Sequence, residues 1–135
     1  MIDTRDLAEK REELQTNLVD SFNDYFDTEI EDFDELTKHI DSSENEDVQE
    51  WRDDNSDDFE HIEEIDYVED NVSEFTYGET LIEYDEFEDY CKELVDLRGV
   101  PDLIKGNIDW DGVTRDLRTG YSEINYQGET YLYRY

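Results

Sequence analysis

The chain of 135 residues has few basic residues and only one cysteine and one proline. Its 11 Lys and Arg oppose 43 Asp and Glu, so the formal net charge is −32. A protein that binds nucleic acid or an anionic membrane must supply cations, so we expect neither as a partner. The single cysteine, Cys91, excludes an internal disulfide framework and is typical of a reducing cytoplasm. The expected partner is a soluble, basic macromolecule.

Long apolar runs are also missing. None approaches the roughly 18 residues of a membrane-spanning helix, and the N-terminus lacks the basic and apolar regions of a signal peptide. High net charge with low hydrophobicity is typical of disorder. However, aromatic residues make up 13% of the chain, and large rings can anchor a small core. We therefore expect a folded, salt-sensitive, cytoplasmic protein.

The charge is unevenly distributed along the chain. Residues 1–100 have a net charge of −30, whereas residues 101–135 have a net charge of only −2. The stretch from Asp20 to Asp89 contains 30 acidic residues, and Lys38 and Arg52 are its only Lys or Arg. A solvated face could explain a short acidic block. Seventy residues of acidic sequence interleaved with aromatic rings instead favour a functional surface.

Helical periodicity dominates the acidic part. Apolar residues recur every three or four positions over residues 4–26, which predicts an amphipathic helix there. Thr28 and Glu31 form a T-x-x-E capping box, which predicts that a second helix begins at Thr28. Ser43 and Glu46 repeat this signal, which predicts a third helix after them.

Residues 53–58 contain no apolar side chain and predict a loop. Asp53, Asn55 and Asp57 match the first ligand positions of a calcium loop, but Asp58 stands where the sharp turn needs glycine. Such spacings arise by chance in so acidic a chain, so we expect no metal site. A further helix is predicted from the apolar residues Phe59, Ile62, Ile65 or Tyr67, and Val68.

The pattern changes after Asn71. Apolar residues around Gly78 favour a pair of strands within residues 75–84. Asp85 is a candidate cap for a helix expected over residues 86–97, after which Pro101 begins a short helical turn.

The C-terminal segment predicts a helix over residues 109–118, followed by a β-hairpin that turns at Gln127-Gly128. The expected fold class is α+β. An acidic helical region, residues 1–72, precedes a small α+β module, residues 73–135, with one continuous domain as the alternative.

Catalytic signals are weak. Cys91 lies on an apolar helix face, which is typical of a small buried hydrophobe rather than a nucleophile. His39 and His61 belong to no metal-ligand pattern, and no glycine-rich phosphate loop is present. A catalytic carboxylate needs a setting that shifts its pKa, and the sequence reveals none. We therefore expect no enzymatic activity and no cofactor.

The amount of charge itself indicates a function. B-form DNA carries one charge per roughly 1.7 Å of axis, so a net charge of −32 equals the phosphates of about 16 base pairs. A basic DNA-binding groove would attract such a surface as it attracts DNA. The hypothesis is competitive inhibition by charge mimicry.

The C-terminal segment adds a set of motifs, with PDLI at residues 101–104, IDWDGVTRDL at residues 108–117 and GETYLYR at residues 128–134. This arrangement resembles the C-terminus of ArdA-type antirestriction proteins, over about residues 87–135. Those proteins typically end with a proline-led turn, an "IDW/Y…ARDL" helix and a short aromatic strand pair. Thr114 stands where the alanine is usual.

The resemblance implies a phage or other mobile-element protein that acts in the bacterial cytoplasm. Such a protein mimics DNA to block a restriction–modification enzyme, often as a dimer, here through the C-terminal module. A CRISPR effector or BREX component is an alternative target. The acidic residues expected to form the partner-binding surface are Asp24, Asp27, Glu31, Asp34, Glu35, Asp53, Asp54, Asp57, Glu60, Glu63, Glu64, Glu83, Glu86 and Asp89.

Two other functions compete with mimicry. An adaptor or chaperone for one basic protein needs the same charge and a partner-specific patch, for which Trp51, Phe59 and Tyr67 are candidates. A mimic must compete with DNA for its target, whereas an adaptor need not. The acidic shell of a halophile's protein is the third alternative, but such shells usually accompany alanine-rich cores, and Ala8 is the only alanine.

Overall fold

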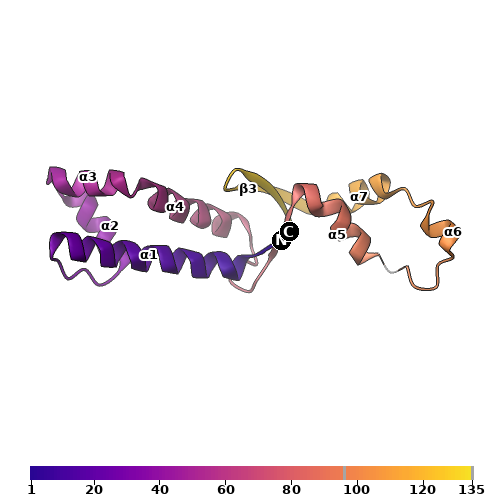
Figure 1. Cartoon of the computed structure of the whole chain (residues 1–135), viewed down its shortest axis with the longest axis horizontal. Helices are drawn as coiled ribbons and strands as arrows, with labels where there is room; N and C mark the ends of the chain where they lie inside the picture. The colour runs from indigo at the N-terminus through magenta and orange to yellow at the C-terminus, as the bar shows by residue number, and fades with distance from the viewer. Residues whose placement is uncertain (96, 135) are drawn as a thin grey trace. The chain divides into compact units, whose positions relative to one another are not determined.

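The computed structural model describes residues 1–95 and 97–134 and shows an α+β protein (Figure 1). The chain divides into two compact units. The helical unit is Arg5–Asn71, and the sheet unit combines Met1–Thr4 with Val72–Tyr135. Asp96 and Tyr135, which the predicted helix and hairpin include, lie outside the described residues.

Four helices build the helical unit. They are α1 (Thr4–Phe26), α2 (Phe33–Ser42), α3 (Glu46–Asp54) and α4 (Ser56–Asn71). In Figure 1, α1 and α4 lie side by side, and an ion pair between Arg11 of α1 and Asp66 of α4 connects them. The predicted helix over residues 4–26 is confirmed.

Aromatic rings form the core of the helical unit where α1, α3 and α4 meet. Phe22 is fully buried, and its ring centroid lies 5.0 Å from that of Trp51. The Trp51 ring lies 6.1 Å from the Phe59 ring, centroid to centroid. Aliphatic side chains complete this core; they are Leu7, Leu14, Leu18, Val19, Ile30, Leu36, Ile40, Val48, Ile62, Ile65 and Val68.

The second helix begins at Phe33 rather than at Thr28, so the predicted capping box is wrong. Asn23 holds the preceding segment instead, because its Oδ1 accepts hydrogen bonds from the Thr28 hydroxyl (2.7 Å) and from the Ile30 N–H (2.9 Å). Asp32 caps the helix, because its side chain accepts a hydrogen bond from the Glu35 N–H, three residues further on, at 2.8 Å. A stronger cap therefore lies four residues after the predicted one.

Two further predictions in the helical unit need correction. Asn45, not Ser43, caps α3, and its side chain accepts a hydrogen bond from the Asp47 N–H. The predicted loop over residues 53–58 is wrong, because Asn55 is the only residue between α3 and α4. The Asn55 side-chain amide donates a hydrogen bond to the Trp51 carbonyl at 2.9 Å. A carbonyl at the C-terminal end of α3 therefore has a hydrogen-bond partner at the junction of the two helices.

The sheet unit contains an antiparallel sheet with strand order β1-β2-β4-β3. Its strands are β1 (Ile2–Asp3), β2 (Thr80–Glu83), β3 (Tyr121–Tyr126) and β4 (Glu129–Arg134). Residues 1–4 were expected in the helical region, but Ile2 pairs with Leu81 of β2. Thr4 anchors the start of the chain to the sheet unit. Its hydroxyl donates a hydrogen bond to the Phe75 carbonyl and accepts one from the Glu79 N–H, both at 2.8 Å.

Helices complete the sheet unit. A 3-10 turn, η1 (Tyr84–Glu86), leads into α5 (Phe87–Leu94), and α6 (Asp102–Lys105) and α7 (Trp110–Arg118) follow. The predicted helix over residues 86–97 is therefore too long, and Asp85 lies in η1 instead of capping it. The predicted strand pair within residues 75–84 is also wrong, because β2 pairs with β1 and β4.

The end of the chain agrees with the sequence. The helix predicted over residues 109–118 is α7, and Asp109 caps it by accepting a hydrogen bond from the Gly112 N–H. The hairpin is confirmed, and both turn residues, Gln127 and Gly128, have positive φ angles. Cys91 is fully buried beside Ile82, Phe87 and Leu132, and burial raises the pKa of its thiol. Of the described helices, none is long and apolar enough to cross a membrane.

Candidate acidic interaction surface

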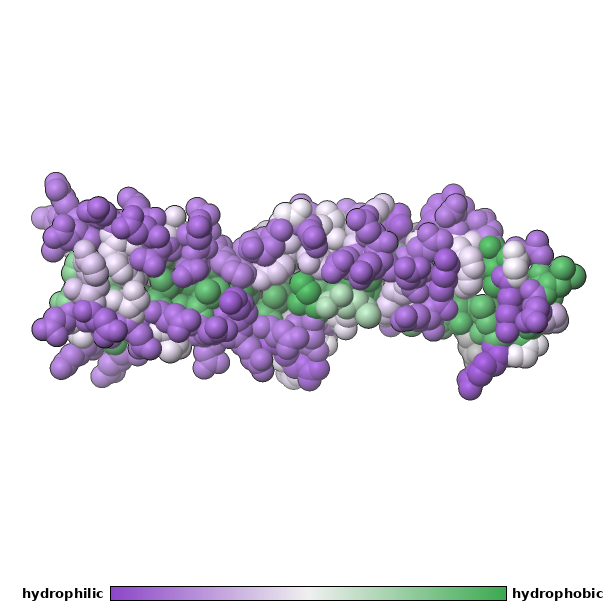
Figure 2. Space-filling view, viewed as in Figure 1, coloured by the Kyte–Doolittle hydropathy of each residue, from purple (hydrophilic) through white to green (hydrophobic). Residues whose placement is uncertain are grey.

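The helical unit concentrates the negative charge. Every residue from Arg5 to Asn71 is described, and this range holds 27 acidic and 5 basic residues, a net charge of −22. None of the 27 acidic residues is buried, and all except Asp58 and Glu64 are exposed. Figure 2 shows the result, with hydrophilic residues over the helices and a narrower apolar band between them. The unit is thus a small apolar core covered by carboxylates.

Helical spacing aligns these carboxylates on α1. Acidic residues recur at three- and four-residue steps on the side opposite the apolar stripe, so they lie above one another along the helix. The pitch of about 5.4 Å sets the approximate distance between successive turns of this row. The acidic residues of the row are Asp6, Glu9, Glu13, Asp20 and Asp24, with Asn17 at the one turn between Glu13 and Asp20 that lacks a carboxylate.

Some acidic residues also stabilise the helices that display them. Asp32 caps α2, and Glu35 accepts a hydrogen bond from the Glu31 N–H at 3.0 Å. Asp34 lies in the first turn of α2 and Asp57 in the first turn of α4, where the helix dipole favours negative charge. The acidic composition is therefore compatible with helix formation.

The basic residues of the unit do little to offset this charge. Arg11 is bound between two carboxylates of α4, with its guanidinium nitrogens 2.6 Å from Asp66 and 3.0 Å from Glu69. The hydrogen bond that Arg11 donates to Glu69 and the charges of both carboxylates raise the pKa of Arg11. Arg52 lies over the Phe59 ring, with its guanidinium carbon 4.0 Å from the ring centroid.

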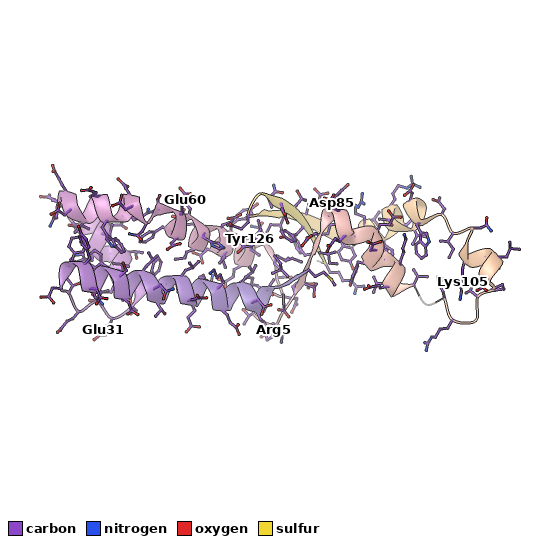
Figure 3. The ribbon with its side chains drawn as sticks, in the orientation of Figure 1. Arg5, Glu31, Glu60, Asp85, Lys105 and Tyr126 are labelled. Carbon is purple, nitrogen blue, oxygen red and sulfur yellow. The ribbon has the colours of Figure 1, made fainter. Side chains whose placement is uncertain are left out.

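The structure brings eleven of the fourteen predicted surface residues together on the helical unit. Two of them, Glu31 and Glu60, are labelled in Figure 3 and lie on the outer sides of the helical unit. All eleven are exposed except the half-buried Glu64. The other three predicted residues, Glu83, Glu86 and Asp89, belong to the sheet unit. There Glu83 lies 3.8 Å and Glu86 3.9 Å from the amino group of Met1.

Sequence reasoning missed other exposed carboxylates of the same unit. Glu9, Glu13 and Asp20 extend the acidic row on α1, and Glu46 and Glu50 lie on α3. The signal was available, because the predicted apolar stripe of residues 4–26 places these α1 positions on the opposite face. We name the full set of exposed carboxylates between Arg5 and Asn71 the acidic surface.

The patch expected for a basic-protein adaptor does not form. Trp51 and Phe59 are only 6% and 5% exposed because both pack in the aromatic core, whereas Tyr67 is 55% exposed. The calcium-like spacing likewise lies across two helices, with Asp53 in α3 and Asp57 in α4. Within the described residues, no group of three or more His, Cys, Asp or Glu side chains is arranged to hold a metal ion.

Comparison of the chain with protein-family models, with curated proteins and with solved structures finds no match.

Proposed function

We propose that this protein inhibits a DNA-binding enzyme of bacterial host defence by occupying its DNA-binding groove. A restriction–modification enzyme is the first candidate target, and a CRISPR effector or BREX component is the second. The protein performs no chemistry in this proposal. It binds as a competitor of DNA, and the acidic surface is the part that enters the groove.

The charge density of the helical unit carries the proposal. Its longest element, α1, has 23 residues and therefore a length of about 35 Å. A net charge of −22 over that length is one charge per about 1.6 Å. B-form DNA carries one per roughly 1.7 Å. A groove that is built for DNA would thus meet a similar linear charge density on this unit.

The way the charges are held supports the same function. They stand on helices that are anchored by buried rings such as Phe22 and Trp51, so little of the backbone must become ordered on binding. Binding would release the counterions that a dense row of carboxylates attracts, as it does for DNA. The affinity should therefore fall steeply as salt rises.

The C-terminal motifs also support the choice of target. The segment over about residues 87–135 resembles the end of ArdA-type antirestriction proteins, which block restriction enzymes. In this chain that segment forms α5, α6, α7 and the β3–β4 hairpin. We propose that this part supports the helical unit or pairs two copies of the chain.

A pull-down tests the proposal directly. The tagged full-length protein is incubated with bacterial lysate, and bound proteins are eluted by a salt gradient, with and without competing duplex DNA. We expect recovery of a DNA-binding defence subunit that duplex DNA displaces. The matched control is elution in buffer of the same ionic strength without DNA, which separates competition from screening.

Two results would contradict the proposal. Recovery of a basic partner that ignores duplex DNA would favour the adaptor function. Retention that stays unchanged between low and high salt would show that the acidic surface does not carry the binding, because contacts between exposed charges weaken strongly with salt.

A further inference from the structure

Arg52 has an unusual position in the acidic part of the chain. It is the only Lys or Arg between Lys38 and Lys92. Carboxylates surround it in sequence, and its guanidinium carbon lies over the Phe59 ring, 4.0 Å from the ring centroid. A guanidinium lies well on an aromatic face, because it is planar and weakly hydrated.

The ring belongs to a groove of about 280 Å³ that Arg52 also lines. Phe33 of α2 and Phe59 of α4 form its aromatic walls, with ring centroids 5.8 Å apart. Asp41 and Glu63 are exposed carboxylates on its lining, whereas the third carboxylate there, Asp66, already binds Arg11. The groove thus combines aromatic walls with two exposed carboxylates, and the Phe59 ring, only 5% exposed, carries the Arg52 guanidinium on its face.

These features together fit one kind of side chain. A guanidinium can lie on an aromatic ring and donate several hydrogen bonds to carboxylates in its own plane. An ammonium is a compact, strongly hydrated charge and uses the rings less well. The groove is therefore complementary to arginine, and Arg52 shows that a guanidinium is accommodated against this ring.

We propose that this groove receives an arginine side chain of the basic partner, and that Arg52 occupies the ring face in the free protein. The inference rests on the proposed function only in requiring that the partner is basic. It adds a specific contact to an otherwise distributed attraction. Arginine, rather than lysine, is then the residue of the partner that selects this surface.

The test uses two defined probes, a nona-arginine and a nona-lysine peptide, with the full-length protein. The measured quantity is the ratio of the two dissociation constants, because a general change of charge shifts the affinity for both peptides in the same direction and cancels in the ratio. Arg52→Ala removes the internal guanidinium, and Lys38→Ala is its control with the same change of charge. We expect Arg52→Ala to increase the preference for nona-arginine at least about threefold, and Lys38→Ala to leave the ratio unchanged.

A second pair of variants keeps the proposal falsifiable if Arg52→Ala fails to fold. Asp41→Asn with Glu63→Gln removes the two groove carboxylates, and Glu9→Gln with Glu13→Gln removes two charges from the row on α1. We expect the first double variant to lower the preference for nona-arginine at least about threefold and the second to preserve it.

An unchanged ratio in both groove variants, or equal changes in groove and control variants, would overturn the inference. The test is independent of the proposed function, because the peptides are not DNA-binding enzymes. If the protein does not compete with duplex DNA for its partner, the mimic proposal is wrong. The peptide ratio still tests the groove in that case.

Discussion

The two units are nearly equal in length but differ in how they accommodate charge. The helical unit has a net charge of −22, and the sheet unit has a net charge of −10. An amphipathic helix buries only a stripe and leaves the rest of its surface for carboxylates. The strands of the sheet unit bury residues on both faces, as Ile124, Tyr131 and Leu132 show, so less surface remains for charge.

The comparison extends to tyrosine. Tyr25 and Tyr67 of the helical unit are 70% and 55% exposed. In the sheet unit, Tyr126, Tyr131 and Tyr133 are buried and form part of the core. Tyr77 and Tyr84 of the sheet unit, which lie outside its strands, are 81% and 40% exposed. The buried tyrosines are therefore those of β3 and β4, so the local secondary structure rather than composition determines which role a tyrosine takes.

The largest expected effect comes from removing one buried aromatic ring from the core of each unit in turn. Phe22 and Phe87 are both fully buried, one in each unit. Either substitution by alanine should cost about 3–5 kcal/mol of unfolding free energy, because it leaves a cavity. Hydrogen exchange measured peptide by peptide should show lost protection in the unit that carries the change. Tyr25→Ala, at an exposed position, is the control and should change stability by less than about 0.5 kcal/mol.

Equal loss of protection in both units from either substitution would break the comparison. The chain would then unfold as one cooperative domain, which is the alternative that the sequence left open.

Charge reversal tests whether the helical unit is the functional one. Replacing Asp24, Asp53, Asp54 and Glu60 by lysine changes its charge by +8. At roughly 0.7 kcal/mol for each reversed contact, the affinity for the partner that duplex DNA displaces should fall about 100-fold. Single neutralisations should have little effect, because the charge is widely spread.

The matched control changes the sheet unit by the same amount. Replacing Glu74, Glu93, Asp116 and Glu123 by lysine should lower that affinity much less. Titration of the purified partner with each variant gives the two dissociation constants. Equal losses would mean that net charge alone determines binding, and unchanged affinity in the first variant would contradict mimicry.

Periodic elements were predictable from sequence, and their joints were not. The stripe on α1 and the Gln127-Gly128 hairpin follow from local spacing and turn preferences, and both are confirmed. The predicted start of α2 was wrong because Thr28 and Asp32 are both suitable caps. The Asn23 side chain decides between them, since it accepts hydrogen bonds from Thr28 and Ile30, five and seven residues further on. Local patterns cannot rank two such caps.

Longer-range pairing was also beyond the sequence. β1 has only two residues, Ile2 and Asp3, and it forms by pairing with β2 nearly eighty residues later. The sequence identified the stretch of the chain with the most acidic residues, but it did not reveal that this stretch is divided between two units. Glu83, Glu86 and Asp89 belong to the sheet unit. The groove beside Arg52 depends on the placement of Phe33 against Phe59 from different helices, which spacing alone does not reveal.

At high pH the sheet unit should lose stability before the helical unit, because two tyrosines of the sheet ionise. Burial, with a hydrogen bond to Tyr90, raises the pKa of Tyr121 to about 12. Burial, with a hydrogen bond to Glu129, raises the pKa of Tyr131 to about 12. Both raised pKa values mean that the folded state favours the neutral form of the tyrosine. Their contribution to the free energy of unfolding is therefore fully present below pH 10 and is lost as the pH rises towards 12.

The expected loss is about 1.4 kcal/mol for each tyrosine and each pH unit in that window. Hydrogen exchange between pH 9 and pH 11, corrected for the intrinsic rate, should show the sheet unit opening before the helical unit. Tyr121→Phe and Tyr131→Phe remove the ionising groups and should flatten this dependence. If the helical unit opens first, repulsion among its carboxylates outweighs the ionisation of the sheet.

The smallest expected effect lies at the hairpin turn. Gly128 has a φ of +78°, a conformation that an L residue with a side chain adopts at a cost, although nothing crowds its Cβ position. Gly128→Ala should therefore destabilise the sheet unit by about 1–2 kcal/mol through backbone strain alone. Gly120→Ala is the matched control, since a Cβ there meets only the Leu117 carbonyl at 3.8 Å. Exchange in the helical unit should be the same in both variants, because the strain is confined to the turn between β3 and β4.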